Sequence, residues 1–563
     1  MKTITAIALS LSVLFSASLA CQSGSEAPSV IAPLGQLEIS ESQSDTSNQA
    51  GSQPANLNTP VEETPSSASE VATEADSSQT SPIQVETIAL DQNAGSFEGY
   101  TLFSPITSTS TYLIDNDGQL IHSWESNFTP GQSVYLLEDG SLLRTANNSP
   151  GPNSGAFNVG GAGGRIELYN WNGDLTWYYE LNNDQYRLHH DVSALPNGNI
   201  LAVAWEAKSA AEAITAGRDP NLLTDEVLWP DMIIEIEPSG SSGGTIVWEW
   251  HVWDHLIQDQ DPTKDNYGII SEHPELIDLN FVQRRSVADW NHINSIDYNP
   301  ELDQIIVSAH NFSELWIIDH STTTAEATAH SGGNSNMGGD LLYRWGNPQV
   351  YDSGSAADQT LFVQHDAEWI DIGLPGEGNI LIFNNGMGRP DGNYSTIVEI
   401  TPSLKADGTY EITPGQSYAP ESAFWTYTAK NPTDFYGSKI SGSQRLPNGN
   451  TLICEGTTGV FFEANMNGDI VWSYINPIIN FPGNGQGQSP QDQRPSGAAR
   501  PGQQPRDNNK PNRAPGNSSL IIASDTAQGP DANPGNSVFK IERYAPDYPG
   551  LADKDLTPKG LLE

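Results

Sequence analysis

The chain is poor in cysteine, in basic residues and in helical periodicity. Only two of its 563 residues are cysteine, and Cys454 is the single one beyond the amino-terminal segment, so the folded part forms no internal disulfide. Lys and Arg total 24 against 70 Asp and Glu. The net charge of −46 repels the phosphates of nucleic acid, and we predict no nucleic-acid partner.

The first 20 residues resemble a secretory signal. Lys2 supplies a positive start, residues 4–15 are apolar, and residues 18–20 form a small-x-small cleavage site. The apolar run is too short for a membrane-spanning helix. We predict export to the periplasm or the cell surface. Lipidation of Cys21 would add a membrane tether. Ser18 departs from the bacterial lipobox pattern, which usually has Leu at this position.

Residues 21–93 are rich in Ser, Thr, Pro and acidic residues, and they contain no Lys or Arg. Such a segment buries too little apolar surface to offset the entropy of ordering it, so it is predicted to be a disordered acidic linker. Residues 94–563 remain for the folded part, a length that suits a repeat architecture. Within them, residues 479–518 are a low-complexity stretch predicted to be a disordered loop.

The folded part repeats one pattern, in which a strand, a polar turn with Gly and a strand with Trp are followed by another Gly turn and an apolar strand. The repeated tryptophans are Trp124, Trp177, Trp248 with Trp250, Trp345, Trp425 and Trp472. Six such units predict an all-β fold, a six-bladed β-propeller in which each Trp packs between blades. Residues 208–216 are the one short helix candidate, and the insertion 251–290 is expected to cover one face.

Ten of the eleven histidines fall between His189 and His365, which indicates that they share one face of the propeller. His190, His292 and His365 each precede a predicted strand, and that strand is followed by a turn and a second strand. Equivalent positions of successive blades converge on one end of the central channel, so we expect these three side chains to meet. Convergent histidines suit metal binding or acid, base and nucleophile chemistry.

Arg389 adds a cation soon after His365, in the Asn-Gly turn of residues 384–389. A guanidinium binds sulfate or phosphate oxygens in a bidentate fork, which makes Arg389 a candidate site residue. The pair His251 and His255 lacks the context of a metal motif, and Asp259, Asp261 and Asp265 lack that of a calcium loop. We predict neither a metal nor a cofactor.

Three strings of residues carry a resemblance to a known family: 248–255, 289–310 and the span from 364 to 389. Over about residues 100–477 the chain resembles the bacterial arylsulfate sulfotransferases. The resemblance implies a six-bladed propeller with a central site, where a sulfuryl group moves from an aryl sulfate to a histidine and then to a phenol, without the nucleotide donor PAPS. It implies that His292, His365 and Arg389 are site residues, and His190 joins them as a candidate.

One departure from the family pattern stands out. The resemblance places the nucleophilic histidine downstream of the arginine, but no histidine follows His365, and residues 441–447 hold none. Another histidine is then the nucleophile, or transfer is direct, or the activity has been lost or changed. The alternative function is a non-catalytic propeller that binds a ligand or another protein. A quinone-dependent dehydrogenase is a third alternative, disfavoured because such propellers usually have eight blades.

Overall fold

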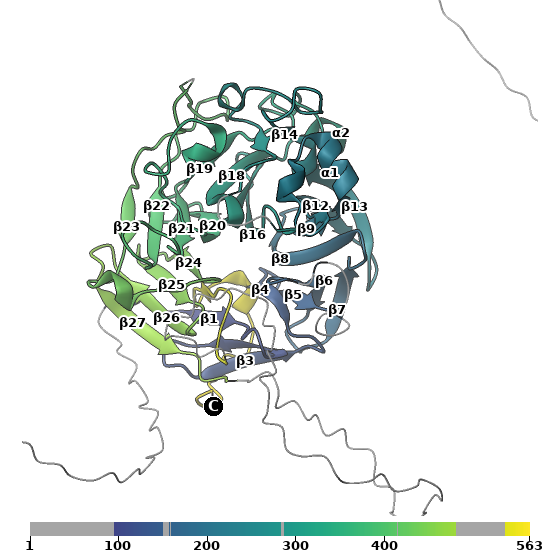
Figure 1. The fold of residues 1–563 in the computed structure, drawn as a ribbon. Helices are drawn as coiled ribbons and strands as arrows, with labels where there is room; N and C mark the ends of the chain where they lie inside the picture. Colours follow the sequence, from purple (N-terminus) through teal and green to yellow (C-terminus); the bar gives the residue numbers. More distant parts are fainter. Residues whose placement is uncertain are drawn as a thin grey trace, which may run out of the picture. The chain divides into compact units, whose positions relative to one another are not determined.

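The computed structural model describes residues 95–149, 157, 159–282, 287–413, 415–479 and 535–562, all within the compact unit Val85–Glu563. The predicted signal, Cys21, the linker 21–93 and nearly all of the loop 479–518 lie outside these residues. Within the described part, no helix is long and apolar enough to cross a membrane. The fold is all-β and propeller-like, with the sheets arranged around a centre (Figure 1).

Four of the sheets are antiparallel and four-stranded. Their strands, in order of pairing, are β28 (Glu542–Tyr544), β1 (Tyr100–Phe103), β2 (Ser110–Ile114) and β3 (Leu120–Glu125); β16 (Ile293–Asn299), β17 (Gln304–Ala309), β18 (Glu314–Asp319) and β19 (Tyr343–Trp345); β20 (His365–Trp369), β21 (Ile380–Asn384), β22 (Thr396–Ile400) and β23 (Trp425–Tyr427); and β24 (Gly442–Arg445), β25 (Thr451–Glu455), β26 (Val460–Ala464) and β27 (Ile470–Ile475).

An eight-stranded sheet has two antiparallel halves. Its strands are β4 (Pro130–Leu136), β5 (Leu142–Asn147), β6 (Gly164–Tyr169) and β7 (Leu175–Glu180), then β8 (Tyr186–Ala194), β9 (Ile200–Glu206), β12 (Asp231–Pro238) and β13 (Gly244–His251). One parallel residue pair, Gln132 with His190, links β4 to β8. The halves are therefore joined much more weakly than the strands within each half.

The remaining elements are short. They are β10 (Lys208–Ser209) with β11 (Val227–Leu228), β14 (Leu256–Ile257) with β15 (Ile277–Asp278), the helices α1 (Ala210–Ala216) and α2 (Thr324–Ala327), and the 3-10 turns η1 (Pro220–Leu222), η2 (Val252–Asp254), η3 (Ile270–Glu272), η4 (His310–Phe312), η5 (Pro348–Tyr351), η6 (Pro432–Asp434) and η7 (Pro549–Leu551). Helix α1 falls on the predicted helix candidate, and Ser209 and Glu212 form a capping box at its start.

The core lies between neighbouring sheets. Strands β9 and β21 are buried at every position because both faces of each sheet pack against another sheet, and their sequences are accordingly apolar up to the last residue. One cluster joins Phe103 and Ile114, in the sheet of β1–β3, to Leu452 and Trp472, in the sheet of β24–β27. The hydrophobic contribution to stability therefore comes from contacts between sheets.

The predicted Asn-Gly turns form between consecutive strands. At residues 195–199 the N–H of Leu195 donates to the carbonyl of Asn199, and Gly198 adopts a φ of +88°. Gly449 repeats this conformation with a φ of +86°. A residue with Cβ is strained in this left-handed region, which explains Gly at these positions.

The tryptophans of the outer strands link each sheet, or half of the long sheet, to the next. The indole N–H of Trp124 donates to the carbonyl of Asn170, and that of Trp177 to the carbonyl of Gly243. The series continues with Trp248 to Thr322, Trp345 to Pro420, Trp425 to Met466 and Trp472 to Asn116. The last of these bonds returns to the turn between β2 and β3, so the series is circular.

The carboxyl-terminal segment closes the ring through β28, which pairs antiparallel with β1 (Figure 1). Arg543 of β28 donates to Glu463 of β26 at 2.7 Å, and both side chains are fully buried. Glu463 also accepts the N–H of Phe97 at 2.8 Å. The pair thus joins the two ends of the described chain.

We expect Glu463→Ala to lower the free energy of unfolding by about 3–5 kcal/mol, because it leaves the Arg543 guanidinium buried without its partner. Glu180→Ala is the matched control: Glu180 pairs with Arg165 at 2.9 Å but is 45% exposed, so we expect a loss of about 0–1 kcal/mol. Urea denaturation of both variants measures the difference. Equal losses would show that the buried pair does not hold the closure.

Candidate functional site

Four histidine rings follow one another around the centre of the fold. His190 lies in β8, His292 directly precedes β16, His310 begins η4 after β17, and His365 begins β20. The ring centroids are 4.7 Å apart for His190 and His292, 5.0 Å for His292 and His310, and 5.2 Å for His310 and His365. The inner strands β8, β16 and β20 pack side by side and bring these residues together.

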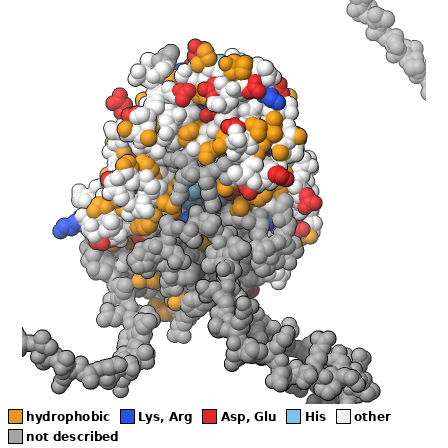
Figure 2. Space-filling model, in the orientation of Figure 1, with side chains coloured by type: hydrophobic (Ala, Val, Ile, Leu, Met, Phe, Trp, Pro, Cys, Tyr) orange, Lys and Arg blue, Asp and Glu red, His pale blue; other side chains and the backbone are white. Residues whose placement is uncertain are grey.

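Phe539 of the carboxyl-terminal segment completes a circle of five rings. Its centroid lies 6.0 Å from that of His190 and 6.3 Å from that of His365. We call His190, His292, His310, His365 and Phe539 the histidine circle. Figure 2 shows histidine atoms near the middle of the molecule, on a face where acidic side chains are scattered among few basic ones.

Backbone bulges direct two of these histidines. His190 and His292 adopt φ values of +50° and +54°, in the left-handed region that residues with Cβ seldom enter. The register of β8 against β9 shifts between Leu188 and Val192, around His190. Such a bulge re-aims a side chain, and a residue held in this region costs on the order of 1–3 kcal/mol, which the packed inner strands offset.

His292 forms a close pair with a carboxylate. Its Nδ1 lies 2.5 Å from Oδ2 of Asp289, and Oδ1 of Asp289 accepts the indole N–H of Trp205 at 2.9 Å. With the carboxylate as acceptor, Nδ1 of His292 carries the hydrogen, and in the neutral form of the ring Nε2 carries the lone pair. A carboxylate bound in this way orients an imidazole and stabilises the cation that forms when Nε2 takes up a proton or an electrophile.

His365 is held through both nitrogens. Its Nδ1 lies 2.8 Å from Oδ1 of Asn385, whose Nδ2 donates to the carbonyls of Gly437 and Ile440. The amide oxygen therefore faces His365, so Nδ1 is the donor. The N–H of Ile440 donates to Nε2 at 3.2 Å. Burial lowers the pKa of His365 to about 3, so the ring stays neutral at neutral pH.

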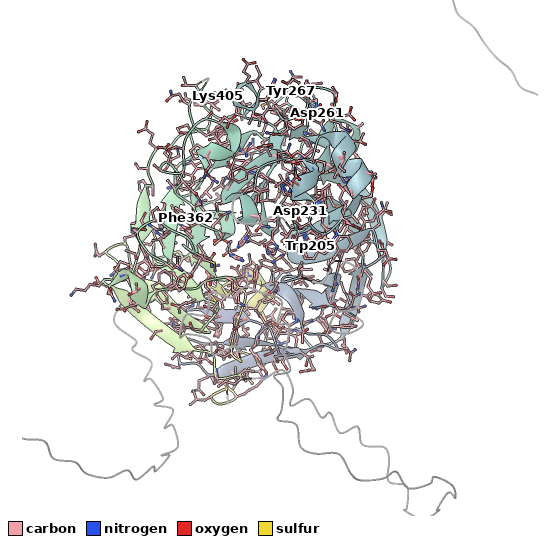
Figure 3. The ribbon with its side chains drawn as sticks, viewed as in Figure 1. Trp205, Asp231, Asp261, Tyr267, Phe362 and Lys405 are labelled. Atoms are coloured by element: carbon pink, nitrogen blue, oxygen red, sulfur yellow. The ribbon has the colours of Figure 1, made fainter. Side chains whose placement is uncertain are left out.

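His310 and His190 have different partners. Nδ1 of His310 lies 2.8 Å from the amide oxygen of Asn311. Nδ1 of His190 lies 2.9 Å from Nδ1 of His189, whose Nε2 lies 2.9 Å from Oδ1 of Asp231. Burial holds the pKa values of His189 and His190 well below the ordinary histidine range. Burial and the neighbouring Asp289 raise the pKa of Asp231. In Figure 3, Trp205 and Asp231 are labelled close to the centre of the ring of sheets.

A buried cation lies next to the histidine circle. Asp191, Asp366 and Lys540 directly follow His190, His365 and Phe539 in the chain. The ammonium of Lys540 lies 3.0 Å from Oδ1 of Asp366 and 3.5 Å from Oδ2 of Asp191. Burial alone would lower the pKa of Lys540, but the carboxylates Asp191 and Asp366 raise it well above its ordinary value. The cation thus offsets the charge of the acids around it.

The described contacts of Arg389 are with its own turn and with Phe362, and none is with a ring of the circle. Nη2 of Arg389 donates to the hydroxyl of Tyr394 at 2.9 Å, its Nε lies 3.3 Å from Asp391, and the guanidinium stacks over Tyr394 and Phe362. The turn that carries it reaches the circle through Asn385, the partner of His365. The structure thus brings His190 and His292 into contact, joins His365 to them through His310, and links Arg389 to them indirectly.

Ser441 lies in the segment where the family resemblance places a histidine. Its hydroxyl accepts the N–H of Gly456 and donates to the carbonyl of Lys439, and its N–H donates to the carbonyl of Phe539. Ser441 therefore holds a turn beside Phe539, and no histidine of the circle comes from this segment.

Several residues of the site were not predicted from the sequence, namely His310, Asp289, His189, Asp231, Phe539 and Lys540. His310 was visible as a histidine directly after an apolar strand, and His-Asp occurs at both 190–191 and 365–366. Phe539 and Lys540 had no such signal, because they reach the centre from the far end of the chain.

A closed arrangement of antiparallel sheets with clustered histidines at its centre defines a propeller protein with a central polar site. The family model "Arylsulfotransferase (ASST)" matches residues 101–478, more than half of the chain. The chain therefore belongs to the arylsulfotransferase family, and this membership supports a sulfotransferase activity at the level of the family. No curated protein matches the chain.

Solved structures give only distant likenesses. A protein of unknown function from Bacteroides caccae is 11% identical with a TM-score of 0.36, covering 67% of this chain and 93% of its own. A catalytically inactive virginiamycin B lyase from Staphylococcus aureus with quinupristin is 10% identical with a TM-score of 0.32, covering 69% of this chain and 88% of its own. Likenesses this weak add nothing to the description of the fold or the site.

Asp297 of β16 predicts a pH dependence of stability. Burial raises its pKa to about 7, although its carboxylate accepts the N–H groups of Trp369 and Tyr298. The folded state therefore binds a proton that the unfolded state releases near pH 4, and stability falls as pH rises from about 4 to 7. The slope from one such group reaches about 1.4 kcal/mol per pH unit.

We expect the free energy of unfolding of Asp297→Asn to fall less steeply with pH over this range than that of the parent chain. This difference in slope is expected whether the variant is more or less stable than the parent at any single pH. Urea denaturation at steps between pH 4.5 and about 7.5 measures both slopes. Parallel curves would mean that Asp297 does not hold its proton in the folded state.

Proposed function

We propose that this protein is an arylsulfate sulfotransferase that transfers a sulfuryl group from an aryl sulfate to a phenol, without a nucleotide donor, and that His292 acts directly on the transferred group. The observation that carries this proposal is the 2.5 Å pair of Asp289 with His292, next to His190 and His310 in the histidine circle. Of the four histidines in the circle, His292 is the one whose described partner is a carboxylate.

In the first half-reaction, Nε2 of His292 attacks the sulfur of the donor. An N–S bond forms, the bond from sulfur to the aryl oxygen breaks, and the aryl oxide leaves and takes a proton from solvent. In the second half, the oxygen of the acceptor phenol attacks sulfur, the N–S bond breaks, and the phenolic proton is released. Asp289 offsets the positive charge of the sulfated imidazole, as expected for an oriented nucleophile.

The other candidates take different roles in this proposal. Both nitrogens of His365 are held by Asn385 and Ile440, so we assign His365 to positioning its neighbour His310. The ring of His190 packs against that of His292, so we assign His190 to the lining of the site where the sulfuryl group is transferred. Arg389 is proposed to bind the sulfate oxygens of the donor. Its pair with the 60% exposed Asp391 is weak enough for an anion to displace.

We also propose that the propeller has six blades. Strands β4 and β8, which join the two halves of the eight-stranded sheet, pair at a single residue position, and counting each half as a blade gives six four-stranded units. The six tryptophan bonds support this count, because each runs from the outer strand of one unit to the next and the last returns to the first unit.

The amino-terminal sequence leads us to propose export, to the periplasm or the cell surface, with Cys21 as a lipid attachment site. Mass spectrometry of the mature amino terminus tests this directly. A chain that begins at Cys21 and carries acyl groups would support the tether, and an unmodified cysteine would exclude it.

We expect the parent chain to release nitrophenol from 4-nitrophenyl sulfate in the presence of phenol. Asp289→Asn should reduce kcat by about 10²- to 10⁴-fold, because an amide no longer fixes the tautomer of His292 or offsets its charge. His292→Ala should lose at least as much. His273→Ala is the matched control, an exposed histidine that pairs with Glu275 outside the circle, and its activity should equal that of the parent.

A donor labelled in its sulfuryl group, given to the chain without an acceptor, distinguishes the two routes of transfer. Release of one nitrophenol per chain with the label kept on the chain, both lost in His292→Ala, indicates a sulfated His292. Turnover that needs the acceptor, with no label kept on the chain, indicates direct transfer, with His292 as the base that takes the phenolic proton. If the folded parent chain turns over none of a panel of aryl sulfates and phenols, the enzyme proposal fails and a ligand-binding propeller remains.

A further inference from the structure

Three possible metal ligands that are not members of the histidine circle lie close together. His255 follows η2, His330 follows α2, and Asp340 precedes β19. The Nδ1 atoms of His255 and His330 each lie 2.8 Å from Oδ1 of Asp340. The three candidate ligand atoms all lie within 4.8 Å of one another.

The hydrogen bonding of His255 leaves its Nδ1 as the ligand atom. Nε2 of His255 lies 2.8 Å from the carbonyl oxygen of Ala327, and a carbonyl only accepts, so Nε2 carries the hydrogen. In a neutral imidazole Nδ1 then carries a lone pair, which faces a carboxylate oxygen at 2.8 Å. Two acceptors at this distance repel unless a proton or a metal ion lies between them.

This arrangement is the one that metal-binding histidines usually show. Such a histidine donates its second ring N–H to a backbone carbonyl or a carboxylate, which fixes the ring and its tautomer. His255 is fully buried, and its ring stacks on that of Trp250, whose indole N–H donates to the carbonyl of Gly339 beside Asp340. The first ligand is therefore held rigidly before any ion binds.

The other two ligands differ in exposure. The carboxylate of Asp340 is 7% exposed, whereas His330 is 62% exposed. An ion at this place would have one buried side and one side open to solvent, where water could complete its coordination. Two imidazole nitrogens and one carboxylate oxygen suit zinc and related transition ions better than calcium or magnesium.

We propose that His255, His330 and Asp340 bind one divalent transition-metal ion, of which zinc is the representative. The ion joins the insertion that contains His255 to the segments after α2 and before β19. We predicted no metal from the sequence because the pair His251 and His255 lacks the context of a metal motif, and in the structure His251 is not the partner of His255. His251 contacts Glu206 and Glu249 instead.

The test uses the full chain, stripped with a chelator and then titrated with zinc. We expect one zinc ion per chain after dialysis, measured by elemental analysis, and a higher Tm with zinc than without it. His330→Ala should weaken zinc binding at least about 10-fold and lose the Tm increase. Because His330 is exposed, this variant should fold even if Asp340→Asn does not.

His273→Ala is the matched control, since His273 is another exposed histidine that pairs with a carboxylate, and its zinc binding should equal that of the parent. Cobalt in place of zinc should give visible absorption bands in the parent and in His273→Ala but not in His330→Ala. The proposal is overturned if the parent retains no zinc, or if His330→Ala binds zinc as tightly as His273→Ala does. The first of these results would mean that the three side chains form only hydrogen bonds with one another.

Discussion

The ammonium of Lys540 between Asp191 and Asp366 is the interaction on which the centre of this protein depends. The two acids come from β8 and β20, and they also accept backbone N–H groups from the neighbouring strands, at Ile296 and Ser443. Without a cation, these carboxylates would repel each other in a site from which water is excluded. Lys540 lies on the carboxyl-terminal segment, which closes the ring of sheets. The segment that closes the fold therefore also supplies the cation that offsets the charge of Asp191 and Asp366.

The same closure completes the site. Phe539, directly before Lys540, stands between His190 and His365, and its carbonyl accepts the N–H of Ser441. The adjacent Ile440 then donates to His365 and fixes its ring. The chemistry proposed for His292 therefore rests on a frame that joins the middle of the folded chain to its carboxyl-terminal end.

Burial and hydrogen bonding make the four histidines of the circle differ in their ability to act as a base or a nucleophile. His365 is neutral and held at both nitrogens, and His190 is buried against His189. His292 has a carboxylate at Nδ1, which is the environment that makes an imidazole a useful base or nucleophile. A histidine at the segment of Ser441 is not required for such an environment, because Asp289 supplies it within the motif of His292. His255, outside the circle, has another environment. The carbonyl of Ala327 fixes its tautomer, and the lone pair of its Nδ1 faces the carboxylate of Asp340.

The sequence by itself determined the all-β class, the Gly turns, the helix near residues 208–216 and the family. It did so because these features depend on local periodicity and on short strings such as 364–389. It also predicted that His190, His292 and His365 would converge, since repeated units place equivalent residues around one axis. Only the tertiary structure decided that His310 stands between His292 and His365, that Lys540 and Phe539 reach the centre, and that the turn of Arg389 contacts His365 through Asn385. These contacts join residues far apart in the chain, and no local pattern records which side chains the closed ring brings within hydrogen-bonding distance.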